Sequence, residues 1–273
     1  MVKKIIKSES GVVGIVTAVL LIGLIVAVVS LVQAVYVPKW MEEKESEHMD
    51  LVVTQFAQLK SAIDTHIANA PKVIPIASPI TLGNKELPYL MSLRAYGSLQ
   101  ILDNSFIIKI NDNVIPSFGT IKYSSMNGYF IDQSFIYENG AFITSQIEGN
   151  MISMKPSLSI GKENSTNVTI NFTMVNIVPV GGKTNGGGYG TTSILTEYKN
   201  SSYYEIPIVN NITINTTYPN AWELFFRGLL DKNNVNYTYF NNGNEVKINF
   251  TDSIAAEYKI VNINAQIGPG WVE

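Results

Sequence analysis

The feature that most constrains this chain is an uncharged run from Gly11 to Pro38, GVVGIVTAVLLIGLIVAVVSLVQAVYVP. As an α-helix this run would be about 42 Å long, which exceeds the roughly 30 Å hydrocarbon core of a bilayer. A removable secretory signal has an apolar region of only about 7 to 15 residues followed by a small-residue cleavage site, and neither feature is clear here. We therefore expect the run to span a membrane.

The charges on either side of the run predict its orientation. Lys3, Lys4 and Lys7 precede it, whereas the segment that follows, KWMEEKESEH, is mainly acidic. Since positively charged flanks stay in the cytoplasm, the N-terminus is predicted to be cytoplasmic and the rest of the chain to lie outside the cell.

A second helical pattern continues directly from the apolar run. Six apolar residues recur at spacings of three and four and form one stripe, which Pro71 ends: Met49, Val52, Phe56, Leu59, Ile63 and Ile67. The sequence thus predicts one helix over 11–70, with 11–38 as the membrane or filament-core part and 39–70 amphipathic. Pro38 is the predicted kink, because it cannot donate a hydrogen bond to the preceding turn.

The remaining chain has strand patterns. Residues 71–90 are rich in proline and are predicted to be a linker or an edge segment, and 91–273 a β-rich extracellular domain. Asn139-Gly140 suits a tight hairpin turn. One short helix is expected in YPNAWELFFRGLLDKNN, with Asn220 as its N-cap and an aromatic core face. The predicted class is α+β: a long N-terminal helix, then an all-β, sandwich-like domain with one short helix.

The composition excludes several kinds of chemistry. The chain has no cysteine, so disulfides, thiolate metal sites and cysteine nucleophiles are excluded, and its only histidines, His48 and His66, are expected on a solvated helix face. The net charge of −3 gives little support to nucleic-acid binding. Lys183 lies in a Gly-Lys-Thr triplet, but Ile177 occupies the position where a phosphate-binding loop needs glycine, so an exposed, flexible loop is expected. We predict no catalytic site, no metal and no cofactor.

Candidate N-glycosylation sites occur only in the part of the chain that is predicted to lie outside. Each begins an Asn-x-Ser/Thr triplet without a central proline: Asn164, Asn167, Asn171, Asn200, Asn211, Asn215, Asn236 and Asn249. Their positions agree with the orientation that the flanking charges predict.

The junction KSESGVVGIVTAVLLIGLIVAVV resembles the class III signal of archaeal type IV pilin-like proteins, the group that includes adhesion pilins and archaellins. The stretch YENGAFITSQIEGNMISMKPSLSI is also similar to a recurring part of archaeal pilin-like exported proteins. The resemblance implies that 1–10 is a leader, that a prepilin peptidase cuts beside Ser10 or Gly11, and that the apolar helix stays on the mature protein. The early glutamate of bacterial pilins is absent.

Two functions remain open at this point. In the first, the chain is a filament subunit whose helices leave the membrane and pack together with copies of itself or with other pilin-like subunits, delivered by a pilus assembly machinery. The residues expected in that helix packing are Val12, Gly14, Thr17, Gly23, Ser30 and Gln33. The polar ones could instead bond to carbonyls of their own helix. In the second, the helix is a permanent membrane anchor for an extracellular binding protein that does not polymerise.

Overall fold

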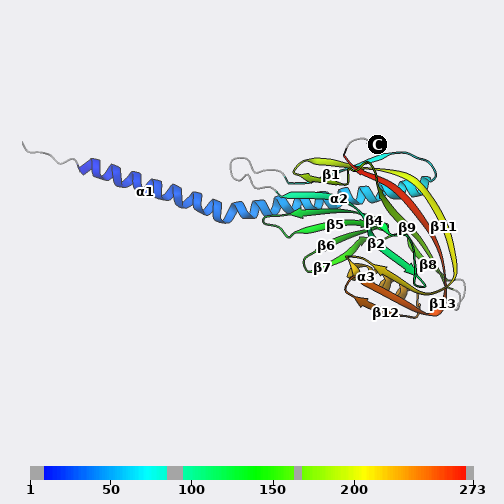
Figure 1. Ribbon diagram of the computed structural model, residues 1–273. Coiled ribbons are helices and arrows are strands. Elements are labelled where there is room, and N and C mark those ends of the chain that lie inside the picture. Colours follow the sequence, from blue (N-terminus) through cyan, green and yellow to red (C-terminus); the bar gives the residue numbers. More distant parts are fainter. Residues whose placement is uncertain (1–8, 85–94, 163–167, 269–273) are drawn as a thin grey trace, which may run out of the picture.

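The structure is a computed structural model that describes residues 9–84, 95–162 and 168–268. Figure 1 shows a long helical rod that enters a β-rich domain and runs along it. The helical segments are α1 (Glu9–Leu31), the π-helical turn η1 (Val32–Tyr36), α2 (Val37–Asn69) and α3 (Pro219–Lys232). The strands are β1 (Ile76–Thr81), β2 (Tyr96–Ile110), β3 (Asn113–Val114), β4 (Phe118–Met126), β5 (Gln133–Glu138), β6 (Ala141–Gln146), β7 (Gly149–Met154), β8 (Leu158–Lys162), β9 (Val168–Pro179), β10 (Asn185–Gly188), β11 (Thr191–Asn215), β12 (Tyr237–Asn242) and β13 (Glu245–Ile267).

The rod is helical without a break from α1 to α2, and it changes direction between them (Figure 1). The amide of Val37 donates to the carbonyl of Val32, five residues earlier, which is the hydrogen bond of a π-turn. Pro38 follows in the first turn of α2, where its missing N–H and fixed φ are tolerated. The distortion predicted at Pro38 thus lies in the turn just before it.

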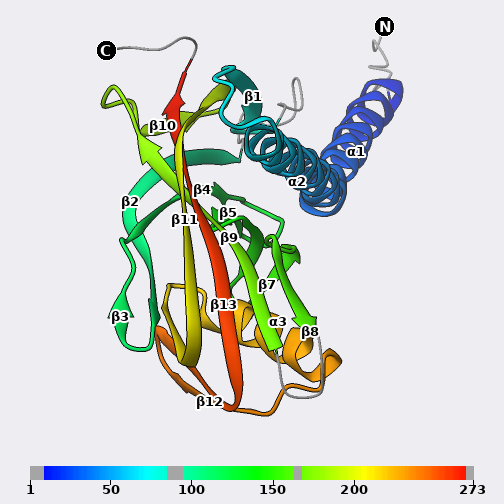
Figure 2. The same ribbon diagram turned by 90° about the vertical axis from the view of Figure 1, so that its right-hand side faces the viewer.

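The described strands form one connected sheet, in the order β7-β6-β5-β4-β2-β11-β13-β9-β8. The long strand β2 joins its two halves, because residues 96–102 pair with β4 and residues 107–110 pair with β11. Neighbours are antiparallel, except that β13 and β9 run parallel. Figure 2 shows β11 and β13 extending along the whole length of the domain.

Opposite faces of the sheet are covered by different helices. On β5, Phe135 and Tyr137 belong to the buried cluster that contains the apolar stripe of α2, whereas Ile136 between them belongs to the cluster that contains Trp222 and Phe226 of α3. Side chains alternate between the faces of a strand, so each face is buried against its own helix. The cluster around α3 contains residues from both halves of the sheet, so the two halves pack against each other as in a β-sandwich.

The predicted fold class, α+β with one long helix followed by a β-rich domain and one short helix, is confirmed. The hairpin turn is confirmed too: Asn139 and Gly140 have φ of 47° and 81° and join β5 to β6. The N-cap assignment in the short helix is wrong. Tyr218 holds that position, and Asn220 lies inside the first turn of α3.

Two segments without a clear strand pattern contribute strands. Of the two alternatives for the proline-rich segment, a linker or an edge segment, the structure has the edge: it contributes the edge strand β1, which pairs with β11, while residues 85–90 lie outside the described residues. The glycine-rich loop after Lys183 contains β10, which pairs with β2. That loop was expected to be flexible. Pairing overrides the low strand propensity of glycine here, and a side chain at Gly187 would require the Tyr96 ring to shift.

Candidate functional site at the exposed helix and its junction

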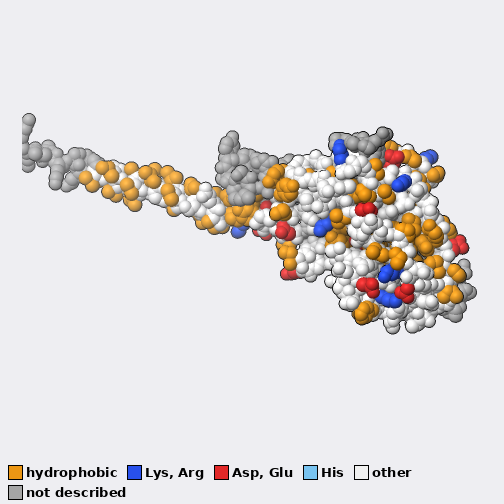
Figure 3. All heavy atoms as spheres, in the orientation of Figure 1, with side chains coloured by type: hydrophobic (Ala, Val, Ile, Leu, Met, Phe, Trp, Pro, Cys, Tyr) orange, Lys and Arg blue, Asp and Glu red, His pale blue; other side chains and the backbone are white. Residues whose placement is uncertain are grey.

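The apolar helix makes no tertiary contact that buries it. Every residue from Val12 to Leu31 is exposed, and Figure 3 shows hydrophobic side chains along the visible face of this part of the rod. An 18-residue window in it has a mean hydropathy of 3.1, so the helix is long and apolar enough to cross a membrane. Such a surface needs lipid or other apolar helices around it.

The residues predicted to act in processing or assembly all lie on this rod. Ser10 and Gly11 fall in the first turns of α1, and their side chains are outside the described part. The predicted assembly residues are exposed: Val12, Gly14, Thr17, Gly23, Ser30 and Gln33. The hydroxyl of Thr17 donates to its own helix, at 2.9 Å from the carbonyl of Val13. In the single chain, Thr17 thus makes the intrahelical bond, and a contact between helices stays a prediction.

An aromatic pair marks the end of the apolar surface. The rings of Tyr36 and Trp40 lie 6.1 Å apart, and both side chains are partly exposed. Exposed acidic residues, Glu42 and Glu43, follow at once. Tyrosine and tryptophan favour the headgroup level of a bilayer, so this pair marks the level at which the helix would leave the membrane.

Beyond the aromatic pair, α2 is packed into the domain by the predicted stripe. Phe56 is fully buried, and its ring lies 5.7 Å from that of Phe142 and 6.0 Å from that of Phe135. Five stripe residues are at most 2% exposed: Met49, Val52, Phe56, Leu59 and Ile63. The stripe thus attaches the helix to one face of the sheet.

Glu45 fixes the junction between the rod and the domain. Its side chain is 1% exposed, and its two oxygens accept hydrogen bonds from the amides of Gly128, Tyr129 and Phe130 at 2.7 to 2.9 Å. These amides belong to the β4–β5 loop. Charge-assisted bonds to three consecutive amides satisfy a carboxylate that burial would otherwise destabilise.

Both histidines are buried, so the expectation of a solvated face is wrong. Nε2 of His48 lies 3.0 Å from the hydroxyl of Tyr123, which donates to the carbonyl of Leu82. Nε2 of His66 lies 3.1 Å from the hydroxyl of Thr196. Because the Tyr123 hydroxyl has its proton on Leu82, Nε2 of His48 must be the donor in its contact. Each histidine thus adds a polar contact between α2 and the sheet, His48 at the start of the apolar stripe and His66 near its end.

We expect the histidines to make stability depend on pH. Burial lowers the pKa of His48 and of His66 below the ordinary 6.5. The unfolded chain therefore binds protons more readily, so the stabilisation is complete above about pH 6.5 and is lost as the pH falls below it. Glu138 titrates in the same range with the opposite sign, so denaturant unfolding at several pH values should show this loss in a Glu138→Gln background. A His48→Gln/His66→Gln protein should lose less on acidification, and an unchanged pH profile would contradict the assignment.

Glu138 is a buried carboxyl that the sequence analysis did not single out. It lies at the end of β5, and its Oε1 accepts hydrogen bonds from Nε1 of Trp222 at 2.6 Å and from the hydroxyl of Thr216 at 2.7 Å. Burial raises its pKa to about 7, while the two donors oppose that rise. The carboxyl ties the β5–β6 turn to the start of α3.

Ionisation of Glu138 is expected to weaken the fold. Its pKa is about 7 when folded against an ordinary 4.5, so its stabilisation is complete below about pH 4.5 and is lost as the pH rises through about 7. The loss is on the order of 3 kcal/mol, since a tenfold change in proton affinity corresponds to about 1.4 kcal/mol. Glu138→Gln should flatten this dependence in denaturant unfolding. A variant that keeps the wild-type slope would refute the prediction.

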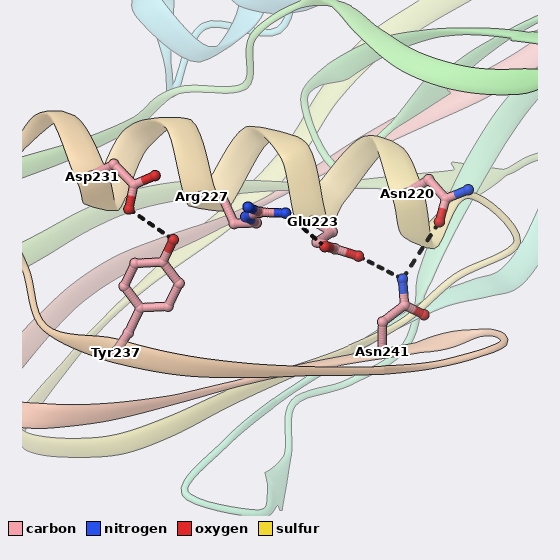
Figure 4. Close-up of polar contacts among 6 residues, drawn as sticks. All are labelled: Asn220, Glu223, Arg227, Asp231, Tyr237 and Asn241. Atoms are coloured by element: carbon pink, nitrogen blue, oxygen red, sulfur yellow. Dashed lines mark hydrogen bonds and ion pairs between the residues drawn. The ribbon is translucent and has the colours of Figure 1, made fainter.

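Charged side chains elsewhere form structural contacts. Figure 4 shows a row along α3 that faces β12, in which Glu223 accepts from Asn241 at 2.7 Å and Asp231 from Tyr237 at 2.9 Å. Arg227 lies 3.3 Å from Glu223 and is partly exposed. These contacts hold the hairpin against the helix. Within residues 9–84, 95–162 and 168–268, no His, Asp and Glu cluster could hold a metal ion.

The candidate glycosylation sites differ in how free their side chains are. Asn164 and Asn167 lie outside the described residues. Exposed acceptors are Asn171, Asn200, Asn215 and Asn236, whereas Asn211 and Asn249 are half-buried. The amide nitrogen to which a sugar would be attached donates to Asp112 in Asn211 and to Asp252 in Asn236. The geometry favours Asn171, Asn200 and Asn215, and their modification stays a prediction.

Comparison with known proteins assigns the chain to a family whose function is unknown. Residues 10–265 match the model of a family of unknown function, DUF7289, and the chain belongs to that family. The match includes the apolar helix together with the β-domain. No curated protein and no solved structure matches the chain.

Proposed function

We propose that this member of the family is a pilin-like structural subunit of an archaeal surface filament. Its N-terminal helices would pack into the filament core, and a glycosylated β-domain would form the outside. The observation that carries the proposal is the apolar helix from Val12 to Leu31, whose residues are all exposed and which continues into α2, packed on the domain. The resemblance of the junction around Ser10 to class III signals supports the same function.

The physical basis is that one apolar surface can be covered in two ways. In the membrane, lipid surrounds α1 on all sides, and in a filament neighbouring copies of α1 would replace the lipid. Since Glu45, His48 and the stripe fix α2 to the sheet, movement of the rod would carry the domain with it. A subunit drawn out of the membrane by its helix needs such an attachment.

The proposal includes the partners and the location. A prepilin peptidase would remove 1–10 on the cytoplasmic side, and an assembly machinery would transfer the subunit from the membrane to the filament. The partners are copies of this chain or other pilin-like subunits. The role is non-enzymatic and needs no cofactor.

The test combines mass and microscopy. We expect the intact mass of protein from its native membrane to lack about ten N-terminal residues, and sheared cell-surface material to contain it in filaments. Ser10→Trp should block processing because it places a bulky ring at the junction, whereas Ser8→Trp, outside the scissile residues, should be processed. A full-length chain that is never found in a fibre would refute the proposal.

The alternative is a permanently anchored binding protein, and one groove favours it. The rings of Tyr204 and Tyr258 stack 5.0 Å apart beside a groove of about 400 Å³. Ile110, Val114 and Asn111 also line this groove. Aromatic faces beside amide groups suit a ligand with apolar and polar edges. An intact leader on a chain that remains singly dispersed would support this alternative.

A further inference from the structure

Two apolar side chains are exposed at the β4–β5 connection, one at the last residue of β4 and one in the loop that follows. Met126 is 68% exposed and Ile131 is 55% exposed. The loop between them is internally fixed, because the amide of Asn127 donates to the carboxylate of Asp132 at 2.8 Å and its side chain donates to the carbonyl of Ile131 at 2.9 Å. Phe130 packs inward against the core around α2. The exposed pair is therefore presented by an ordered loop.

Glu45 sets the height of this loop above the end of the apolar surface. Glu45 follows Trp40 by five residues, which is about 7.5 Å along a helix axis, and tilting of α2 can only bring it closer to the membrane. The headgroup layer of a bilayer is roughly 5 to 8 Å thick on each side. Because Glu45 bonds directly to Gly128, Tyr129 and Phe130, the loop lies beside that layer when α1 spans the bilayer.

We propose that Met126 and Ile131 dock on the lipid surface from which α1 emerges, as a second membrane contact that fixes the orientation of the β-domain. The proposal rests on the membrane stage of the proposed function. Membrane binding through two side chains is weak by itself. Because α1 already anchors the chain, the loop is present at the bilayer at a high effective concentration, and a weak contact is sufficient.

The charges near the loop indicate which lipids suit it. Glu42, Glu43 and Asp50 are exposed on the neighbouring helix and outnumber the exposed Lys39, and Lys44 is paired with Glu47. This surface repels anionic headgroups. Docking should therefore occur on zwitterionic lipid and weaken when anionic lipid is added.

The test uses the absence of cysteine from the chain, which permits single labelled positions. Full-length Ile131→Cys and Met126→Cys proteins carrying an environment-sensitive fluorophore are reconstituted into phosphatidylcholine vesicles with nitroxide-labelled headgroups. We expect several-fold greater quenching at these positions than at a matched control, Ile208→Cys. Ile208 is 58% exposed and lies roughly 40 Å of strand beyond Thr196, a residue of β11 that contacts His66 of α2.

A third label separates this proposal from its premise. Gly23→Cys lies in the middle of the apolar helix and should be quenched by nitroxides on the acyl chains. If Gly23→Cys is quenched but Ile131→Cys matches Ile208→Cys, the docking proposal is refuted and membrane insertion stands. If Gly23→Cys is not quenched, the membrane stage itself fails. The measurement is repeated at one protein per vesicle. If quenching at Ile131→Cys then disappears, the loop contacts a second copy of the chain, and lipid docking is refuted.

Discussion

Phe56→Ala is expected to destabilise the protein by about 3 to 5 kcal/mol, the cost of deleting a large aromatic side chain from a close-packed core. Phe56 is fully buried, and its ring contacts those of Tyr123, Phe135 and Phe142 at centroid distances of 5.7 to 6.3 Å. The loss would be a large part of a typical total stability of about 5 to 15 kcal/mol. Guanidinium unfolding of the full chain in detergent, followed by near-ultraviolet circular dichroism, measures it.

Leu51→Ala is the matched control. Leu51 lies on the same helix but is 46% exposed, so its truncation should change the free energy of unfolding by no more than about 0.5 kcal/mol. If Phe56→Ala and Leu51→Ala cost the same, α2 does not pack on the sheet. The rod would then be free to move independently of the domain.

Ile22→Lys is expected to abolish filaments while the protein stays in the membrane. Ile22 is exposed in the middle of α1, where one lysine adds about 2.5 to 3.5 kcal/mol to membrane insertion, which the many remaining apolar residues offset. Among packed helices the same charge would be buried without a partner, because the lysine ammonium group could not reach water. Because α1 is apolar on all sides, no face of it can accommodate the charge in a filament core.

The control for the helix variant is Leu51→Lys, which adds the same charge to an exposed position of α2. Membrane fractionation and electron microscopy of sheared material compare the two proteins. Normal filaments from Ile22→Lys would argue against a core built from α1. Loss of the variant from the membrane would show that insertion, not assembly, is the sensitive step.

The features that were predicted correctly are those whose signal lies in neighbouring residues, either as a repeat or as a turn dipeptide. The stripe through Val52, Phe56 and Leu59 repeats every three or four residues, and such a repeat defines a face before any partner is known. Asn139-Gly140 predicts its turn because both residues adopt positive φ at low cost. Glycine-rich β10 was missed because its pairing with β2 depends on residues about 85 positions away.

The hydrogen bonds of His48 and His66 to the sheet, and the burial of Glu138, could not be predicted from local sequence patterns. His48 meets Tyr123 across 75 residues, and His66 meets Thr196 across 130. Glu138 reaches Trp222 across 84 residues. A histidine at the edge of an apolar stripe has the same local sequence whether it is solvated or hydrogen-bonded, so only the approach of a distant strand distinguishes the two cases.

The sequence by itself determined that a long apolar helix precedes a β-rich domain, because hydrophobic length and periodicity are properties of neighbouring residues. Only the tertiary structure decided how the two parts are joined. Burial of the stripe and the three amide bonds to Glu45 fix α2 to the domain, and the bonds to Glu45 require backbone from a loop more than 80 residues away to satisfy a group on the helix.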